Sequence, residues 1–198
     1  MRHQRANFAA PLLACLGGLA LLAGAVTPAQ AWEPKAYEGR YQIDFPSQPK
    51  ESLEQVQTPS GTMTVRTLSV STDDGVLAVQ YYELPPKLVD DLGTDRFLDK
   101  ARDGVISRAR GRLVTEVVTP LEGYPGRAFL AVLPDQRTYL AGRAFLAGNR
   151  AYLVLATGSR ETLALPEYRR FLKSFALLDR ATRRDTEPVD EFTDFPEE

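Results

Sequence analysis

The side chains that most often carry enzymatic chemistry are scarce in this chain of 198 residues. It holds a single histidine, His3, and a single cysteine, Cys15, and both lie in its first segment. Ser-His-Asp and Cys-His nucleophile systems need a base that titrates near neutral pH, and zinc, copper and haem sites are built mainly on His and Cys. Without the first segment, only carboxylates, Lys, Tyr and Arg remain for chemistry. We therefore expect a protein that is not an enzyme and that binds no cofactor.

Residues 1–31 have the pattern of a cleavable signal peptide. The start is basic, residues 8–26 are mostly apolar, and the small-x-small triplet Ala29-Gln30-Ala31 precedes Trp32 as a cleavage site. Two alternatives stay open: a retained anchor, since the apolar run approaches the roughly 18 to 20 residues of a membrane span, and a lipoprotein modified at Cys15. Cleavage predicts a periplasmic or secreted protein whose mature chain has no transmembrane segment.

The charges are divided unevenly along the predicted mature chain. Eight acidic residues against three arginines make 179–198 an acidic tail, which we expect to be disordered because its apolar periodicity ends after Leu178. Residues 32–178 are close to neutral and are long enough for one domain with a core. A field of positive charge that would indicate nucleic-acid binding is absent from this sequence.

Alternating apolar and polar residues predict a protein rich in strands. The first strand, 40–45, stops at Pro46 and is therefore expected at an edge, and 53–57 is a short second strand. Strands at 62–71 and 76–83 flank a hairpin signal, Asp73-Asp74-Gly75. Four further strands are expected at 113–119, 128–133, 138–145 and 151–156, the last two joined through Gly148-Asn149.

Two segments have the apolar periodicity of helices. Thr94 is expected to cap a helix over 95–110, and Pro166 to begin a second one. Few helices among many strands predict an α+β fold, an antiparallel sheet of about six or seven strands packed with two helices. A closed barrel with accessory helices is the alternative.

Four local patterns occur in an order typical of one family. They are Phe45-Pro46-x-x-Pro49, the sequence GYPGR at 123–127, GRAFLAGNRAYL at 142–153, and FLKSF at 171–175. The chain resembles the bacterial exported proteins of the PsbP-like superfamily over about 40–178. The resemblance implies an antiparallel sheet sandwiched with helices. Photosynthetic members bind the lumenal side of photosystem II and help to retain its ions, so the resemblance implies an adaptor or binding role without catalysis.

Two places are candidate partner-binding sites. Tyr124 and Arg127 belong to a turn that a rigid sheet would display, and Phe192 and Phe195 are aromatic anchors within the acidic tail. Weaker candidates are a groove lined by tyrosines, an anion site of arginines, and weak calcium binding by Asp73-Asp74 and the carboxylates of the tail. The groove would be formed by Tyr81, Tyr82, Tyr139 and Tyr152, the anion site by Arg108, Arg110, Arg112, Arg169 and Arg170, and the calcium site by Asp73 and Asp74 with the tail.

The sequence therefore favours an exported, non-enzymatic accessory or adaptor protein that binds another protein of the cell envelope. The alternative is a periplasmic protein that binds a small molecule or lipid between sheet and helix. A hydrolase based on carboxylates is a third hypothesis, although no spacing in the sequence marks an acid/base pair.

Overall fold

The computed structural model describes residues 32, 34–37, 40–58 and 61–178. The predicted signal peptide and the predicted acidic tail lie outside these residues. The elements in chain order are β1 (Pro34–Tyr37), β2 (Tyr41–Asp44), β3 (Lys50–Thr58), β4 (Gly61–Ser71), β5 (Val76–Glu83), α1 (Pro86–Leu92), α2 (Thr94–Arg108), β6 (Arg112–Val118), β7 (Gly126–Val132), β8 (Tyr139–Ala147), β9 (Arg150–Gly158), α3 (Arg160–Ala164), α4 (Pro166–Lys173) and β10 (Ala176–Leu177).

The predicted α+β fold is confirmed. Seven strands form one antiparallel sheet in the order β3-β4-β5-β9-β8-β7-β6, so β3 and β6 are its two edges and the sheet is open. The closed barrel is therefore wrong. The two predicted hairpins form, with Ser71 opposite Val76 and Ala147 opposite Arg150.

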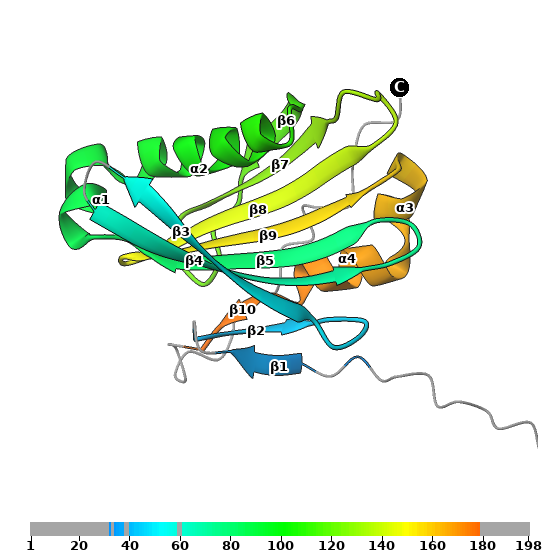
Figure 1. Cartoon of the computed structure of the whole chain (residues 1–198), viewed down its shortest axis with the longest axis horizontal. Coiled ribbons are helices and arrows are strands. Elements are labelled where there is room, and N and C mark those ends of the chain that lie inside the picture. Colours follow the sequence, from blue (N-terminus) through cyan, green and yellow to red (C-terminus); the bar gives the residue numbers. More distant parts are fainter. Residues whose placement is uncertain (1–31, 33, 38–39, 59–60, 179–198) are drawn as a thin grey trace, which may run out of the picture.

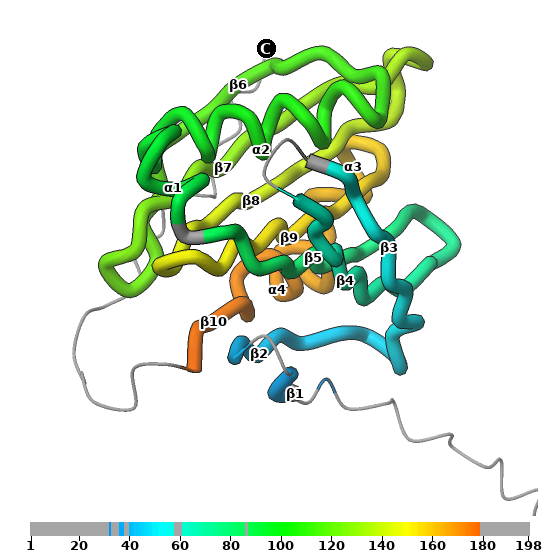
Figure 2. Tube along the Cα trace, turned by 60° about the vertical axis from the view of Figure 1, so that its left-hand side comes forward, coloured from blue at the N-terminus to red at the C-terminus, as the bar shows by residue number. Residues whose placement is uncertain are grey.

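The helices cover opposite faces of this sheet (Figures 1 and 2). One face packs against α1 and α2, whose buried residues include Phe97, Leu98 and Ile106. The other face packs against α3, α4 and a second sheet of three strands. The larger core lies on this second side, where Tyr41, Tyr152 and neighbouring rings fill the space between the layers.

The second sheet was not predicted. β2 lies at its centre, between β1 and β10, although Pro46 had led us to expect the segment 40–45 at an edge. Proline stops β2 at one end without preventing strands from pairing on both of its sides, because its ring affects only its own backbone N–H and its neighbours. The second sheet brings the two ends of the domain together.

The helix α2 differs from its prediction at its start. Its N-cap is Gly93, with φ of 73°, and no side chain caps it, so the expected cap by Thr94 is wrong. Gly93 is also the C-cap of α1, which the sequence reading missed. Glycine adopts a positive φ more easily than other residues do, so it suits a position that ends one helix and caps the next. Thr94 therefore lies inside the first turn of α2.

One glycine allows an aromatic ring to lie flat on the sheet. A Cβ atom added at Gly142 in β8 would lie 2.2 Å from Cζ of Phe129 in β7. Phe129 is itself buried in the small cluster under Ile106 of α2. The absent side chain at Gly142 therefore leaves room for the Phe129 ring beneath Ile106 of α2.

Candidate functional site

The hairpin between β6 and β7 contains the turn that the sequence singled out. Glu122 and Gly123 have φ angles of 52° and 84°, so the two central residues are both left-handed, as in a type I′ turn. Leu121 and Tyr124 flank them and exchange two backbone hydrogen bonds of 2.9 and 2.8 Å. The turn is anchored, because the backbone N–H of Leu177 in β10 donates to Glu122 at 3.4 Å.

The structure separates the two predicted contact residues of this turn. Tyr124 is half-buried and packs against the larger core. Arg127 lies on the other side of the sheet and is 9% exposed; its Nη2 donates to Oδ1 of Asp95 at 2.8 Å. Arg127 therefore joins the sheet to α2, and it is not displayed at the tip of the loop.

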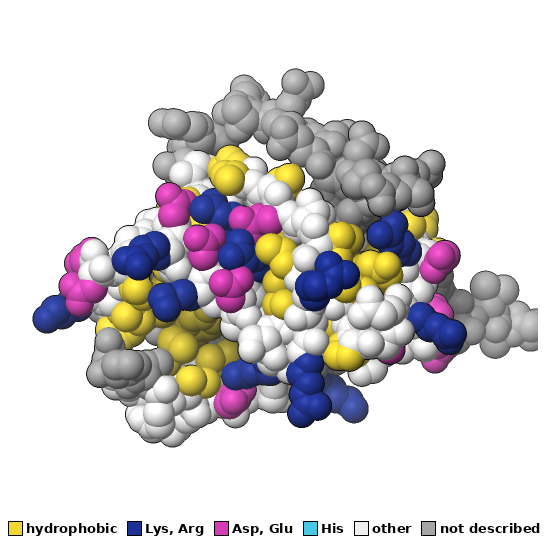
Figure 3. Space-filling model, turned by 90° about the horizontal axis from the view of Figure 1, so that it is seen from above, with side chains coloured by type: hydrophobic (Ala, Val, Ile, Leu, Met, Phe, Trp, Pro, Cys, Tyr) yellow, Lys and Arg dark blue, Asp and Glu magenta, His cyan; other side chains and the backbone are white. Residues whose placement is uncertain are grey.

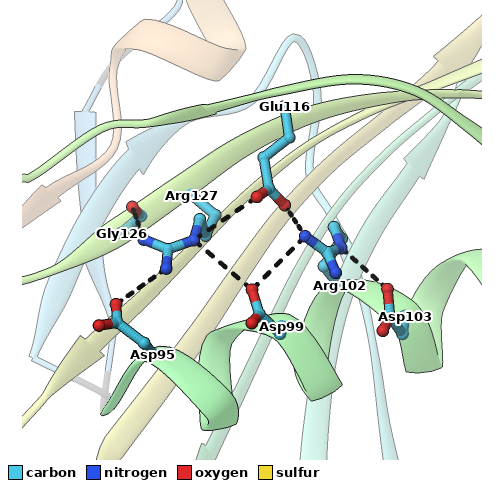
Figure 4. Close-up of polar contacts among 7 residues, drawn as sticks. All are labelled: Asp95, Asp99, Arg102, Asp103, Glu116, Gly126 and Arg127. Atoms are coloured by element: carbon cyan, nitrogen blue, oxygen red, sulfur yellow. Dashed lines mark hydrogen bonds and ion pairs between the residues drawn. The ribbon is translucent and has the colours of Figure 1, made fainter.

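Arg127 belongs to an ion cluster between α2, β6 and β7 (Figure 4). Its Nε lies 3.7 Å from carboxylate oxygens of both Asp99 and Glu116. Arg102 also contacts Glu116 and Asp99, and its Nε donates to Asp103 at 2.8 Å. The hydrogen bonds to Asp103 and Glu116 raise the pKa of the Arg102 guanidinium, although burial opposes them.

The ion cluster has more negative than positive groups. Its members are Asp95, Asp99, Asp103, Glu116, Arg102 and Arg127, so four carboxylates face two guanidinium groups. Both arginine side chains are nearly buried, at 13% and 11% exposure, whereas those of Asp95 and Asp103 are 80% and 64% exposed. The surplus negative charge is thus on the solvent side of the cluster.

The strand β6 leaves its outer edge open. Among the described residues, no strand pairs with this edge. Its four large apolar side chains are unusually exposed, from 38% to 65%: Leu113, Val114, Val117 and Val118. The opposite edge strand, β3, carries charged residues and two of them form ion pairs with Arg66 and Arg108. Charges are the usual protection of an edge strand, and β6 has little of it.

The register fixes which backbone groups of β6 face outward. The N–H of Thr119 donates to the carbonyl of Gly126, so this is a hydrogen-bonded pair. Hydrogen-bonded and non-hydrogen-bonded pairs alternate in an antiparallel ladder. Val117, opposite Ala128, therefore bonds to β7, whereas the backbone groups of Val118, opposite Arg127, point to the open edge.

A bulge limits the length of this regular edge. The register shifts between Leu113 and Thr115, which leaves Thr115–Val118 as the straight part of β6. Glu116 is a non-hydrogen-bonded position like Val118, since the two are separated by one residue. The open edge therefore offers the N–H and carbonyl groups of Glu116 and Val118.

Two depressions lie beside the β8–β9 turn, and both include Asn149. One, of about 370 Å³, lies among Tyr124, Pro125, Asp90 and Thr94. The other, of about 250 Å³, is lined by Arg40, Tyr81, Glu83 and Arg150. Tyr81 donates to Glu83 at 2.6 Å, and burial together with this contact raises the pKa of Tyr81. Both hollows are open to solvent.

The tyrosines serve mainly as core residues. Tyr81 and Tyr82 point to opposite faces, as predicted for neighbours on a strand: Tyr81 stacks on Tyr152 at 5.5 Å, and Tyr82 meets Phe97 of α2. Tyr139 lies under the guanidinium of Arg160. The rings do not converge on a common groove.

The remaining candidates are dispersed. Arg108 pairs with Glu54, and Arg170 pairs with Asp44 and donates to the carbonyl of Trp32. Within the described residues, no group of three His, Cys, Asp or Glu side chains could hold a metal ion, Asp73-Asp74 included. Phe192 and Phe195 lie outside the described residues. None of the described helices has the length and apolar character needed to cross a bilayer.

The arrangement defines a class of protein: an α+β sandwich of antiparallel strands with one open edge beside an ion cluster. A solved structure has the same architecture. The solution structure of cyanobacterial PsbP (CyanoP) from Synechocystis matches with a TM-score of 0.51 and 14% sequence identity, over 85% of this chain and 99% of that one. No protein-family model and no curated protein matches the chain. The likeness shows the fold, and this fold is PsbP-like, as the sequence resemblance implied.

Proposed function

We propose that the protein is an exported, non-enzymatic accessory protein that binds another protein of the cell envelope. The open edge of β6 is the observation that carries this proposal. An edge strand with free N–H and carbonyl groups is a template for a strand from a second chain. The exposed apolar side chains of β6 would be buried by such a strand, which adds a hydrophobic contribution to the backbone hydrogen bonds.

The state of the carboxylates supports a role without catalysis. Among the described residues, a cluster of carboxylates lies around Arg102 and Arg127. Each of these carboxylates contacts a guanidinium group. These contacts hold the carboxylate oxygens in ion pairs that join α2 to the sheet. A structural role of this kind disfavours the carboxylate hydrolase.

The packing between the layers counts against the alternative of an internal ligand. Phe145 and Phe175 stack at 5.5 Å between their ring centres, and Tyr152 contacts Phe175 at 5.4 Å. These rings occupy the space between sheet and helix where a small molecule or lipid would lie. The depressions near Asn149 are at the surface and open to solvent.

The test is an affinity pull-down from the native envelope fraction with residues 32–198 as bait. Three further baits are compared: a chain that ends at Leu178, Val118→Pro, and its control Val118→Ala, which keeps the backbone N–H. We expect recovery of a partner with the full chain and with Val118→Ala, and its loss with Val118→Pro. Recovery of the same partner by Val118→Pro would place the interface elsewhere, and recovery of no partner by any bait would refute the adaptor role.

A further inference from the structure

We propose that Arg143 in β8 binds a carboxylate of the acidic tail, residues 179–198, on the face of the sheet that lies away from α2. This inference goes beyond the proposed function, because it concerns the opposite face from the ion cluster and leaves the open edge of β6 free. It follows from a half-buried guanidinium group that has no carboxylate partner among the described residues.

Arg143 has two contacts in the described part of the chain, and neither is with a carboxylate. Its Nη1 donates to the carbonyl of Leu172 at 2.9 Å, and its guanidinium lies over the ring of Phe145, 5.0 Å from the ring centre. Leu172 is near the C-terminus of α4, where the carbonyls carry only part of a negative charge. The Nε atom is buried and has no hydrogen-bond partner. Burial lowers the pKa of Arg143.

Two nearly buried arginines on the other face of the sheet are paired with carboxylates. Arg102 and Arg127 have side chains of 13% and 11% exposure, and both contact Glu116. Figure 3 shows basic and acidic side chains mixed on this flank of α2. A guanidinium group that is taken out of water without a counter-ion is unfavourable. We therefore expect Arg143 to have an anion beside it that comes from outside the described residues.

A second polar atom without a partner lies on the same face as Arg143. The hydroxyl of Thr119, directly after β6, is buried and has no hydrogen-bond partner. Thr119 pairs with Gly126, and Gly126 is opposite Phe145, so the side chain of Thr119 lies on the side of the Phe145 ring. Buried polar atoms are nearly always hydrogen-bonded in native proteins. A carboxylate accepts hydrogen bonds from guanidinium and hydroxyl groups alike, so the same chemistry would satisfy both donors.

The acidic tail begins close to these groups and is long enough to reach them. Phe175 stacks on Phe145 with 5.5 Å between the ring centres, three residues before Leu178. Leu178 is six residues after Leu172, so the chain between them spans at most about 20 Å. Residues 185–198 carry seven acidic side chains and no basic one. The seven residues from Leu178 to the first of them span up to about 25 Å, so each of these carboxylates can reach Arg143.

The test compares residues 32–198 with a neutralised chain, in which the seven acidic residues of 185–198 are replaced by Asn or Gln. In an NMR spectrum of arginine side chains, the Nε–H signal of Arg143 should shift and exchange faster with solvent in the neutralised chain. The Tm should fall by about 3–10 °C, as for the loss of a hydrogen bond to a charged group. Neutralisation should leave the Tm of Arg143→Gln unchanged. In the control Arg169→Gln, which removes an exposed charge on α4, the fall should persist.

Two outcomes would overturn the proposal directly. One is an Arg143 signal and a Tm that do not change in the neutralised chain, and the other is an equal fall of Tm in the Arg143→Gln and Arg169→Gln backgrounds. If Arg143→Gln does not fold, the Nε–H signal in the two chains that retain Arg143 decides.

Added acetate tests a free carboxylate as the source of the anion. We expect acetate to shift the Arg143 signal only in the neutralised chain, because the tail occupies the site in the other. Equal shifts in both chains would overturn occupation by the tail. The proposed function is tested separately by the pull-down with Val118→Pro, so the failure of one leaves the other standing.

Discussion

Proline placed at two neighbouring positions of β6 tests the register on which the open edge depends. Val117 donates its N–H to β7, so Val117→Pro would leave the carbonyl of the buried residue Ala128 without its donor. A buried acceptor left unsatisfied costs about 1–3 kcal/mol of unfolding free energy. The N–H of Val118 faces outward, and proline is tolerated at such edge positions. We expect Val118→Pro to cost less than about 1 kcal/mol.

The assay is urea unfolding of residues 32–198, followed by circular dichroism. In thermal unfolding of the same variants, a difference of about 2 kcal/mol in unfolding free energy corresponds to about 4–8 °C in Tm for a domain of this size. Hydrogen exchange of the unmodified protein provides a control without substitution, because the amide of Val117 should exchange much more slowly than those of Glu116 and Val118. Equal destabilisation by the two prolines, or equal protection of the amides, would refute the register and the docking site together.

Three further predictions concern the hairpin and the core. Gly142→Ala should lower the unfolding free energy by about 1–3 kcal/mol because its Cβ collides with the buried ring of Phe129. In a double-mutant cycle, adding Phe129→Leu should recover part of that loss, and strictly additive costs of the two substitutions would contradict the collision. Gly123→Ala should destabilise the protein by about 1–2 kcal/mol, measured as a fall in Tm, because a residue with a Cβ atom is strained at the φ of 84° that the type I′ turn requires there. Burial raises the pKa of Tyr82 and Tyr152 to about 12 in the folded state. Their contribution to stability is therefore complete below pH 10 and is lost between pH 10 and 12, and unfolding midpoints measured from pH 8 to 12 should fall only above pH 10.

The parts of the fold that local sequence determines were predicted well. The Asp73-Asp74-Gly75 and Gly148-Asn149 turns fix their hairpins within a few residues, so both hairpins could be predicted. The elements that were missed are short: β10 has two residues, and α1 has seven and begins at the second of two prolines. Their stability comes from packing against other elements, which no local pattern records.

The candidate site was less predictable for the same reason. Tyr124 and Arg127 were singled out as neighbours on one turn, and the pairing of β7 sends them to opposite faces of the sheet. The ion cluster draws its members from α2, β6 and β7. Asp95, Asp99 and Asp103 recur at every fourth position of α2, but no local pattern shows that Glu116 and Arg127 of the strands lie beside them. Consecutive apolar residues such as Val117 and Val118 are typical of a central strand. Only the strand order shows that they lie at an edge, where their exposure becomes informative.

The central position of β2 in the smaller sheet has a consequence for the order in which the domain is completed. Its partner β10 pairs Leu177 with Tyr41, residues from opposite ends of the domain. Contacts of such long sequence separation slow folding, because the loop between them must close first. During synthesis, the rings that Phe175 covers stay uncovered until this last part of the chain is available. A nascent chain of this protein thus leaves these aromatic rings uncovered for almost the whole time of its synthesis, until its last strand can pair with β2.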